Sequence, residues 1–165
     1  MRKALAGRWH ALTVLVLVAV SAALLATVYL REYRPDGQTD AASVAAAIDA
    51  ASTGTTALLS YAPETIDDDL NTSRSLMTGE FLTYYSKFTA EVVAPAVRDE
   101  GVRARAQVVR AALMEIRPDL AKVLLFLNQE TSSRDRPEPA PTASSVVVSM
   151  TKADGKWLIS AFDPV

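Results

Sequence analysis

The stretch VRARAQVVRAALMEI, residues 102–116, decides the fold, because apolar residues recur there at nearly every second position. Charged or polar residues fill most of the alternate positions. This pattern is typical of a β-strand with one buried and one solvated face. The residues expected on the buried face are Val102, Ala104, Ala106, Val108, Ala112, Met114 and Ile116. Because apolar residues before this stretch follow a helical spacing, the sequence predicts helices first and strands afterwards.

Arg110 interrupts the alternation of this first strand. Strict alternation would direct Arg110 inward, between Val108 and Ala112. Two interpretations remain open: a β-bulge at residues 108–110 returns the side chain to solvent, or the side chain enters a polar cavity and meets a carboxylate. We favour the bulge.

Three more strands are predicted. Residues 121–129 are apolar on both faces in their middle part, which is typical of a central strand. Residues 144–152 and 156–162 form a pair around the tight-turn sequence Asp154-Gly155. The intervening segment TSSRDRPEPAPT, residues 131–142, contains Pro137, Pro139 and Pro141 and is predicted to be a surface loop outside the sheet. A motif that binds a partner is the alternative.

Three helices are predicted before residue 102. The first follows a capping residue at position 39 or 40 and extends to Leu58, and the second follows Thr65 as its N-cap. The third starts near residue 79 and ends or kinks at Ala94, because Pro95 disfavours helical geometry in the residue before it. Three helices followed by a four-stranded antiparallel meander define an α+β fold, with the helices packed on one face of a curved sheet.

Several side chains are candidates for a binding surface. Asp67, Asp68 and Asp69 suggest calcium, but without an EF-hand pattern we favour stabilisation of the helix N-terminus, with a partner-facing acidic surface as an alternative. Tyr84 and Tyr85 belong to an aromatic helix face that either packs in the core or lines a ligand cavity. The candidate interface or cavity residues are Asp67, Asp69, Tyr84, Tyr85, Arg110, Pro137 and Pro139.

The stretch ALTVLVLVAVSAALLATVYL, residues 11–30, contains no charge and is long enough to cross a bilayer as a helix. A cleaved secretory signal is the alternative, but its apolar region is usually shorter. The residues expected to anchor the chain in the bilayer are Ala11, Leu12, Val14, Leu15, Leu17, Leu24, Leu25, Val28 and Leu30. We therefore predict a cytoplasmic flank at 1–10, a transmembrane helix at 11–30, a stalk at 31–39 and an extracytoplasmic domain at 40–165, held at the inner membrane.

Composition limits the chemistry. After residue 30 the chain has 14 basic and 19 acidic residues, a net charge of −5, which argues against nucleic acid as a partner. The chain has no Cys, and its single histidine is His10 in the N-terminal flank, so thiol catalysis is excluded and a zinc site is unexpected. We expect no catalytic residues, no cofactor and no metal.

Four segments carry a resemblance to known proteins. The order of elements and the closing GKWLISAFDPV, residues 155–165, resemble the cystatin-like half-barrel of the nuclear-transport-factor-two superfamily. The segments LLSYAPETIDDDL (58–70), LMTGEFLTYYSKF (76–88) and VLLFLNQETSS (123–133), behind one N-terminal membrane helix, resemble the actinobacterial Mce-associated membrane proteins, including their orphan members. The family's tight turn and aromatic helix correspond to Thr78, Gly79, Phe81 and Tyr85, and its acidic helix start to Asp67 and Asp69.

The resemblance implies a non-enzymatic accessory protein that assembles or stabilises an Mce-type lipid-import complex, with Mce proteins and the permease as partners beside the bilayer. It supplies no catalytic residue and no cofactor. Two alternatives remain open. One is a half-barrel that binds a lipid or small apolar ligand, with enzymatic activity of the ketosteroid-isomerase kind as its least favoured form. The other is an inner-membrane scaffold similar to those of type IV secretion systems.

Overall fold

The computed structural model describes residues 20–27 and 40–165 of the chain. Residues 20–27 are helical, and residues 41–165 form a compact unit that we describe by itself. In chain order its elements are α3 (Ala41–Leu58), α4 (Ile66–Ser75), α5 (Gly79–Phe88), the π-helical turn η2 (Thr89–Val93), α6 (Ala94–Glu100), β1 (Arg103–Ile116), β2 (Leu120–Ser132), β3 (Ala140–Ala153) and β4 (Lys156–Pro164).

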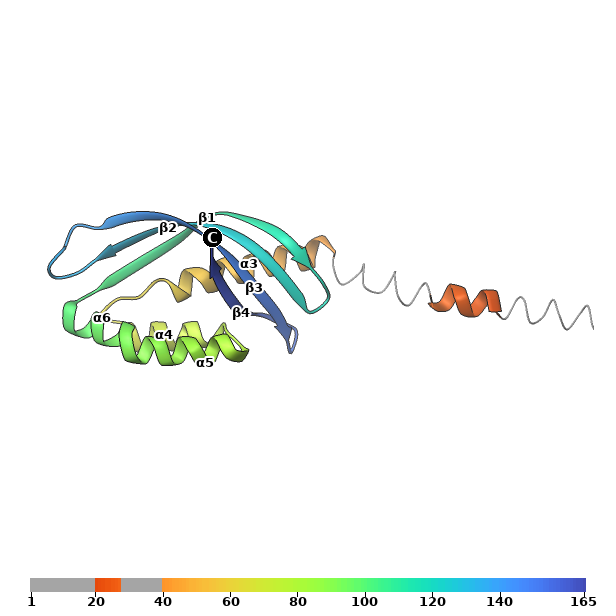
Figure 1. Cartoon of the computed structure of the whole chain (residues 1–165), viewed down its shortest axis with the longest axis horizontal. Helices are drawn as coiled ribbons and strands as arrows, with labels where there is room; N and C mark the ends of the chain where they lie inside the picture. The colour runs from red at the N-terminus through yellow and green to blue at the C-terminus, as the bar shows by residue number, and fades with distance from the viewer. Residues whose placement is uncertain (1–19, 28–39) are drawn as a thin grey trace, which may run out of the picture. The chain divides into compact units, whose positions relative to one another are not determined.

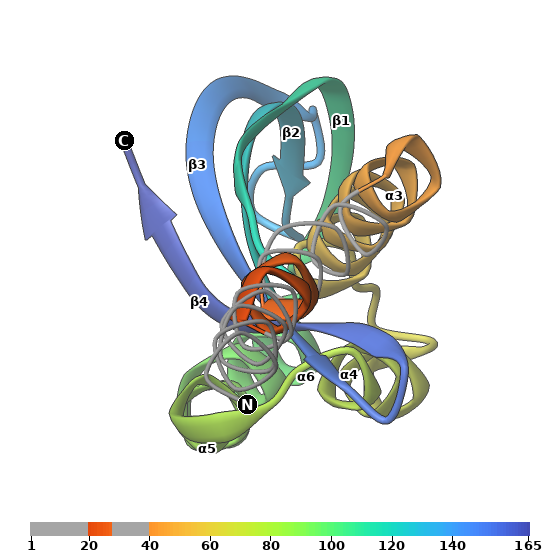
Figure 2. The ribbon, with the colours of Figure 1, turned by 90° about the vertical axis from the view of Figure 1, so that its right-hand side faces the viewer.

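The four strands form one antiparallel sheet in the order β1-β2-β3-β4. Figure 1 shows the curved sheet on one side of this unit and α4, α5 and α6 on the other. The helix α3 contacts all four strands and runs beside β1 (Figure 2). The predicted α+β arrangement, with helices on one face of a four-stranded meander, is confirmed.

The core lies between the helices and the inner face of the sheet. Alternate residues of β2, namely Val123, Leu125 and Leu127, are buried, as expected for a strand with one face on the core. Small residues allow α3 to approach the sheet closely. A Cβ at Gly54 would lie 2.8 Å from Cδ1 of the fully buried Ile159 on β4, so a larger residue has no room there.

The bulge predicted near Arg110 is confirmed, and a second one follows it. The register shifts once between Val108 and Arg110 and again between Leu113 and Glu115. Each shift inserts one extra residue into β1 and therefore moves the following side chains to the opposite face. The assignment of Ala112 and Met114 to the buried face is wrong: both are exposed. Ala111 and Leu113 pack against the core in their place.

The chain does not leave helical geometry at Ala94, and the predicted count of three helices is too low. The turn η2 continues α5 directly into α6. Pro95 lies in the first turn of α6, directly after η2. The Ala94 N–H group just before it bonds to the Thr89 carbonyl five residues back, so the regular four-residue hydrogen-bond pattern, in which a proline cannot take part, is already interrupted there. Gly101, with φ 67°, ends α6 in the left-handed conformation expected of a glycine C-cap.

The prediction that the proline-rich segment, residues 131–142, forms a loop outside the sheet is partly wrong. The strand β3 begins at Ala140, four residues earlier than predicted, and Pro141 lies opposite Glu130 of β2. Proline lacks only the N–H donor, so it is tolerated near a strand end. Pro137 and Pro139 are exposed in the connection between the two strands. The predicted turn at Asp154-Gly155 is confirmed by positive φ angles at both residues.

The predicted membrane anchor falls mainly outside the described residues. Leu24 and Leu25 belong to the helical segment 20–27 and are exposed. None of the helices that the structure describes is long and apolar enough to cross a membrane. The remaining predicted anchor residues lie outside the described residues; they are Ala11, Leu12, Val14, Leu15, Leu17, Val28 and Leu30. The same holds for the predicted flank at 1–10 and the stalk at 31–39.

Candidate partner-binding groove

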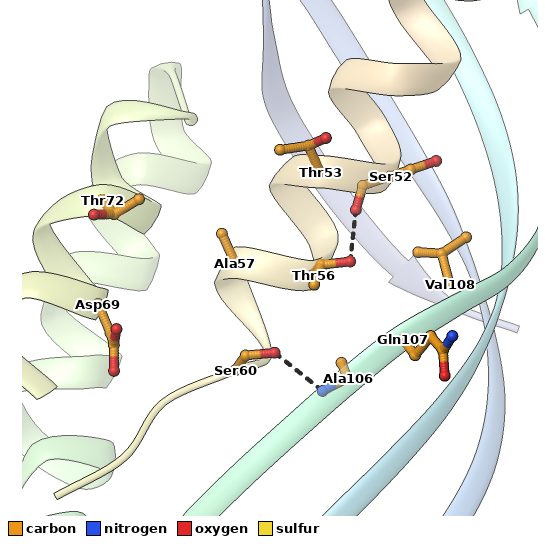
Figure 3. Close-up of a pocket in the computed structure, with 10 residues that line it drawn as sticks. All are labelled: Ser52, Thr53, Thr56, Ala57, Ser60, Asp69, Thr72, Ala106, Gln107 and Val108. Carbon is orange, nitrogen blue, oxygen red and sulfur yellow. Dashed lines mark hydrogen bonds between the residues drawn. The ribbon is translucent and has the colours of Figure 1, made fainter. Parts of the chain in front are cut away.

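A groove of about 580 Å³ runs over the outer side of α3, between α4 and the edge strand β1 (Figure 3). Its lining consists of Ser52, Thr53, Thr56, Ala57, Ser60, Asp69, Thr72, Ala106, Gln107 and Val108. A second hollow of about 570 Å³ continues it toward Tyr61 and residues 103–105. The two hollows share Thr56, Ser60, Asp69 and Ala106 among others, so we treat them as one groove.

Hydroxyl groups form the side of the groove that α3 supplies. Ser52, Thr56 and Ser60 are spaced by four residues and therefore lie on one face of the chain as it leaves the helix. The Ser52 hydroxyl donates to the Ile48 carbonyl (2.7 Å), and the Thr56 hydroxyl donates to the Ser52 carbonyl (2.9 Å; Figure 3). Because their protons are used within the helix, these two hydroxyls can offer a bound molecule mainly acceptor lone pairs.

The edge strand β1 forms the opposite wall. Tyr61 and Ala104 exchange two backbone hydrogen bonds of 3.0 Å, and the Ser60 hydroxyl accepts a bond of 3.0 Å from the Ala106 N–H group. Backbone groups alternate in direction along a strand, so the Ala106 carbonyl and the Val108 N–H group face this same edge. Within residues 40–165, no further backbone hydrogen bond extends the pairing beyond Ala104 along this edge. Within the described residues this edge is therefore hydrogen-bonded at Ala104 and Ala106, and no strand pairs with it beyond them.

Asp69 brings a carboxylate to the groove from α4. One of its oxygens accepts hydrogen bonds from the Thr65 hydroxyl (2.7 Å) and from the Ala62 N–H group (3.2 Å). Thr65 is the N-cap residue, as predicted, but its side chain makes no capping bond to the helix backbone. Asp69 thus fixes the loop that leads into α4 while contributing negative charge to the groove.

An ion pair lies at the far end of the groove. Arg103 donates to both carboxylate oxygens of Glu64 at 2.8 Å. A hydrogen bond from the backbone of Glu64 itself, followed by the bond from Arg103, holds the pKa of the Glu64 carboxyl below its usual value. Arg103 and Arg105 both line this end. The groove therefore has the Asp69 carboxylate in one part of its lining and two guanidinium groups in another.

Of the predicted site residues, the structure brings only Asp69 to the groove. Asp67 is exposed and forms an ion pair of 2.6 Å with Arg98 of α6. Tyr84 and Tyr85 line a different cavity, between α5 and β4. Arg110 is exposed and donates to the Val109 carbonyl at 3.4 Å, which removes it from any polar cavity. Pro137 and Pro139 belong to neither site and lie in the connection from β2 to β3.

Sequence reasoning missed most of the groove. Its α3 side follows from hydroxyl residues repeated at a spacing of four from position 52, a signal that is visible in the sequence. Its β1 side comes from Gln107 and Val108, which lie roughly fifty residues further along and join it only after folding. In the described part of the chain, no group of three or more His, Cys, Asp or Glu residues is arranged to hold a metal. The groove can supply hydrogen bonds and charge to a polar partner.

Several solved structures share this fold, and some of them are described as type IV secretion system proteins. The chain superposes with a TM-score of 0.62 on an IcmL-like type IV secretion system protein of Legionella pneumophila, at 12% identity over 76% of this chain and 92% of that one. The periplasmic domain of DotI gives a TM-score of 0.60 at 15% identity, over 76% of this chain and 95% of that domain. CagV of Helicobacter pylori, a VirB8 homologue, gives 0.57 at 15% identity over 73% and 97%. The unit therefore has the nuclear-transport-factor-two-like fold, which it shares with these proteins.

Sequence comparison gives the family. No protein-family model matches the chain. Over 151 residues the chain is 49% identical to the uncharacterized protein Rv1362c of Mycobacterium tuberculosis, covering 92% of this chain and 69% of that protein. Over 132 residues it is 44% identical to the outer membrane protein Rv1973 of the same organism, covering 79% and 82%. The chain belongs to the family of these two mycobacterial proteins. A membership among Mce-associated proteins rests on the sequence motifs alone.

Proposed function

We propose that this protein is a membrane-associated scaffold of the cell envelope, whose extracytoplasmic domain binds other envelope proteins without catalysing a reaction. The observation that carries the proposal is the match of the whole folded unit to DotI and CagV, which are described as a periplasmic domain and as a VirB8 homologue of a type IV secretion system. The name of the relative Rv1973, an outer membrane protein, supports an envelope location.

The groove supports a role in binding proteins. An open strand edge offers backbone N–H and C=O groups to an extended segment of a partner, which binds by adding a strand. The hydroxyls of α3 and the charges of Asp69 and Arg103 lie along the same path and can select polar side chains in that segment. We therefore assign partner binding to this groove.

The identity of the partner is a separate question. The resemblance of residues 58–70, 76–88 and 123–133 to Mce-associated proteins favours Mce proteins and the permease of a lipid importer. The scaffold proposal does not require these partners, because any multiprotein envelope complex needs assembly subunits. The likeness to secretion proteins concerns the fold alone, so it favours no particular complex.

A tag after Val165 allows the test. The full chain is expressed at its native level, membranes are solubilised, and proteins recovered through the tag are identified by mass spectrometry. The control is a variant carrying Thr56→Arg and Gln107→Arg, which fills the groove from both walls with charged side chains. The proposal predicts a stoichiometric envelope partner that the double variant loses. Equal recovery with both proteins, or no specific partner, would contradict it; Mce subunits among the partners would establish the narrower role.

Topology is tested independently. A reporter that is active only outside the cytoplasm, fused after Val165, is expected to be active, and the chain is expected in the membrane fraction. Separation of inner from outer membrane then decides between the predicted inner membrane and the location that the name of Rv1973 indicates. Activity of a cytoplasm-specific reporter at the same position would overturn both the orientation and the envelope role.

A further inference from the structure

A second cavity lies between α5 and the end of β4, on elements separate from the groove wall that β1 provides. Its volume is about 320 Å³, which falls within the range of small-molecule sites. Its lining consists of Leu58, Leu59, Tyr61, Phe81, Tyr84, Tyr85, Phe88, Thr89, Val93, Phe162 and Pro164. Six of these residues are aromatic and three are aliphatic, and none of the lining residues carries a charge. We call this space the aromatic cavity.

Two stacked pairs of rings shape the aromatic cavity. Phe81 of α5 stacks on Phe162 of β4 with ring centroids 6.3 Å apart, and this pair joins the helix to the sheet. Tyr84 stacks on Phe88 with centroids 6.0 Å apart. Tyr84 is 63% exposed and Phe88 is 41% exposed, so this second pair forms the rim. Exposed aromatic side chains grouped at an opening are typical of surfaces that contact an apolar molecule or a partner.

The lining of the aromatic cavity is uncharged, and the hydroxyls of Tyr85 and Thr89 in it already have hydrogen-bond partners. The Tyr85 hydroxyl donates to the Leu58 carbonyl at 3.2 Å, and the Thr89 hydroxyl donates to the Tyr85 carbonyl at 2.8 Å. Burial raises the pKa of Tyr61 and of Tyr85, so both phenols stay uncharged at neutral pH. A charged ligand group inside the cavity would lose its hydration without gaining a counter-ion.

The turn η2 gives the cavity its end wall. A π-turn is wider than an α-turn, and such turns occur frequently at functional sites. Here both Thr89 and Val93, the first and last residues of η2, line the cavity, whereas Val92 does not. The irregular backbone between α5 and α6 therefore forms part of the cavity wall.

We propose that the aromatic cavity binds one neutral hydrocarbon chain, namely the acyl or alkyl chain of a lipid-like molecule. The volume has room for about ten groups of the size of a water molecule or a methylene, so it fits one chain and not a whole phospholipid. The uncharged lining matches a neutral chain and excludes an anionic headgroup, which would remain at the rim beside Tyr84.

The test uses the full chain and two photoactivatable probes. In one arm the protein is reconstituted in phosphatidylcholine vesicles containing a phosphatidylcholine with a diazirine-bearing acyl chain. In the other arm a diazirine-bearing dodecanol is added to protein in plain phosphatidylcholine vesicles. After illumination, labelled peptides are mapped by mass spectrometry, and an excess of unlabelled dodecanol tests whether labelling is saturable. The two arms distinguish a chain drawn from the bilayer from a free molecule.

The proposal predicts saturable labelling of peptides containing residues 81–93 and 162–164 in at least one arm. Phe88→Ala and Tyr84→Ala should each reduce this labelling about fivefold or more, because each removes apolar surface from the rim. Val92→Ala is the matched control, since Val92 is 52% exposed in the same turn but lies outside the lining. Labelling that is not saturable, absent from both peptides, or equal in Phe88→Ala and Val92→Ala would overturn the proposal. Circular dichroism confirms that each variant is folded.

Discussion

The hydroxyl of Tyr85 donates a hydrogen bond to the main-chain carbonyl of Leu58 across 3.2 Å, and so joins the middle of α5 to the last residue of α3. Tyr85 is 7% exposed and Leu58 is 6% exposed, so water has little access to either group. A buried carbonyl that loses its donor retains the cost of its lost hydration. This bond therefore stabilises the fold as well as shaping the aromatic cavity.

Replacing Tyr85 by Phe is expected to lower the free energy of unfolding by about 1–2 kcal/mol, because the ring stays and only the hydroxyl is lost. Urea unfolding of the full chain, followed by circular dichroism, measures the change. Tyr84→Phe is the control, since the Tyr84 side chain is largely exposed, and it should change stability little. Equal effects of the two substitutions would show that the Leu58 carbonyl does not depend on this donor.

Alkaline pH should destabilise the protein through its buried phenols. Burial raises the pKa of Tyr61 and Tyr85 above the ordinary 10.0, so folding favours the protonated form. The stabilisation that these protonated phenols contribute is fully present below about pH 10, the pKa of tyrosine in the unfolded chain. It is lost as the pH rises through their higher pKa in the folded protein. The free energy of unfolding should therefore fall above about pH 10. The free energy of unfolding of the Tyr85→Phe variant should fall less steeply with pH over that range. The same slope in the variant and in the unsubstituted protein would contradict the raised pKa of Tyr85.

Gly54→Val should destabilise the packing of α3 on the sheet. The new side chain meets Ile159, which is fully buried and cannot move into solvent. Overpacking of this kind costs about 2 kcal/mol. Ala46→Val introduces the same residue on the exposed side of the same helix and should cost about 0.5 kcal/mol at most. Thermal unfolding of both variants measures the difference, and similar melting temperatures would show that α3 does not approach β4 so closely.

Asp67 and Asp69 should differ in their contributions to stability, although both lie in the first turn of α4. Asp67→Asn loses an exposed ion pair with Arg98 and should change the free energy of unfolding by about 0.5 kcal/mol or less. Asp69→Ala removes the acceptor for the Thr65 hydroxyl and the Ala62 N–H group and should cost about 1–2 kcal/mol. Chemical denaturation compares them. A larger loss from Asp67→Asn would reverse the roles assigned to these carboxylates.

Much of the fold could be predicted because its elements have strong periods. The change from helical to alternating spacing at residue 102 located the boundary between helices and sheet, and Asp154-Gly155 located a hairpin. The errors arose where a single residue changes the backbone geometry and the pattern of apolar and polar residues does not reveal the change. A single extra residue in β1 moved Met114 to the exposed face, and the helix that was predicted to end or kink at Ala94 continues through Pro95 as α6.

The groove and the aromatic cavity were harder to predict, because each joins segments that are far apart in the chain. The aromatic helix face indicated either a core or a cavity, and the structure divides it: Tyr85 is buried, whereas Tyr84 and Phe88 stand at a rim. Phe162, which completes that cavity, gave no signal of its own. The groove depends on the open edge of β1, and edge position follows only from the order of strands in the folded sheet.

The most direct test of the scaffold proposal is site-specific photocrosslinking in living cells. A photoreactive amino acid is placed at Gln107, in the groove wall, or at Lys122, an exposed position on β2 outside the groove. The proposal predicts discrete adducts of higher mass from position 107, each containing an envelope protein, and no such adducts from position 122. Adducts from position 122 alone, or none from position 107 in cells that contain the folded protein, would contradict partner binding through this groove.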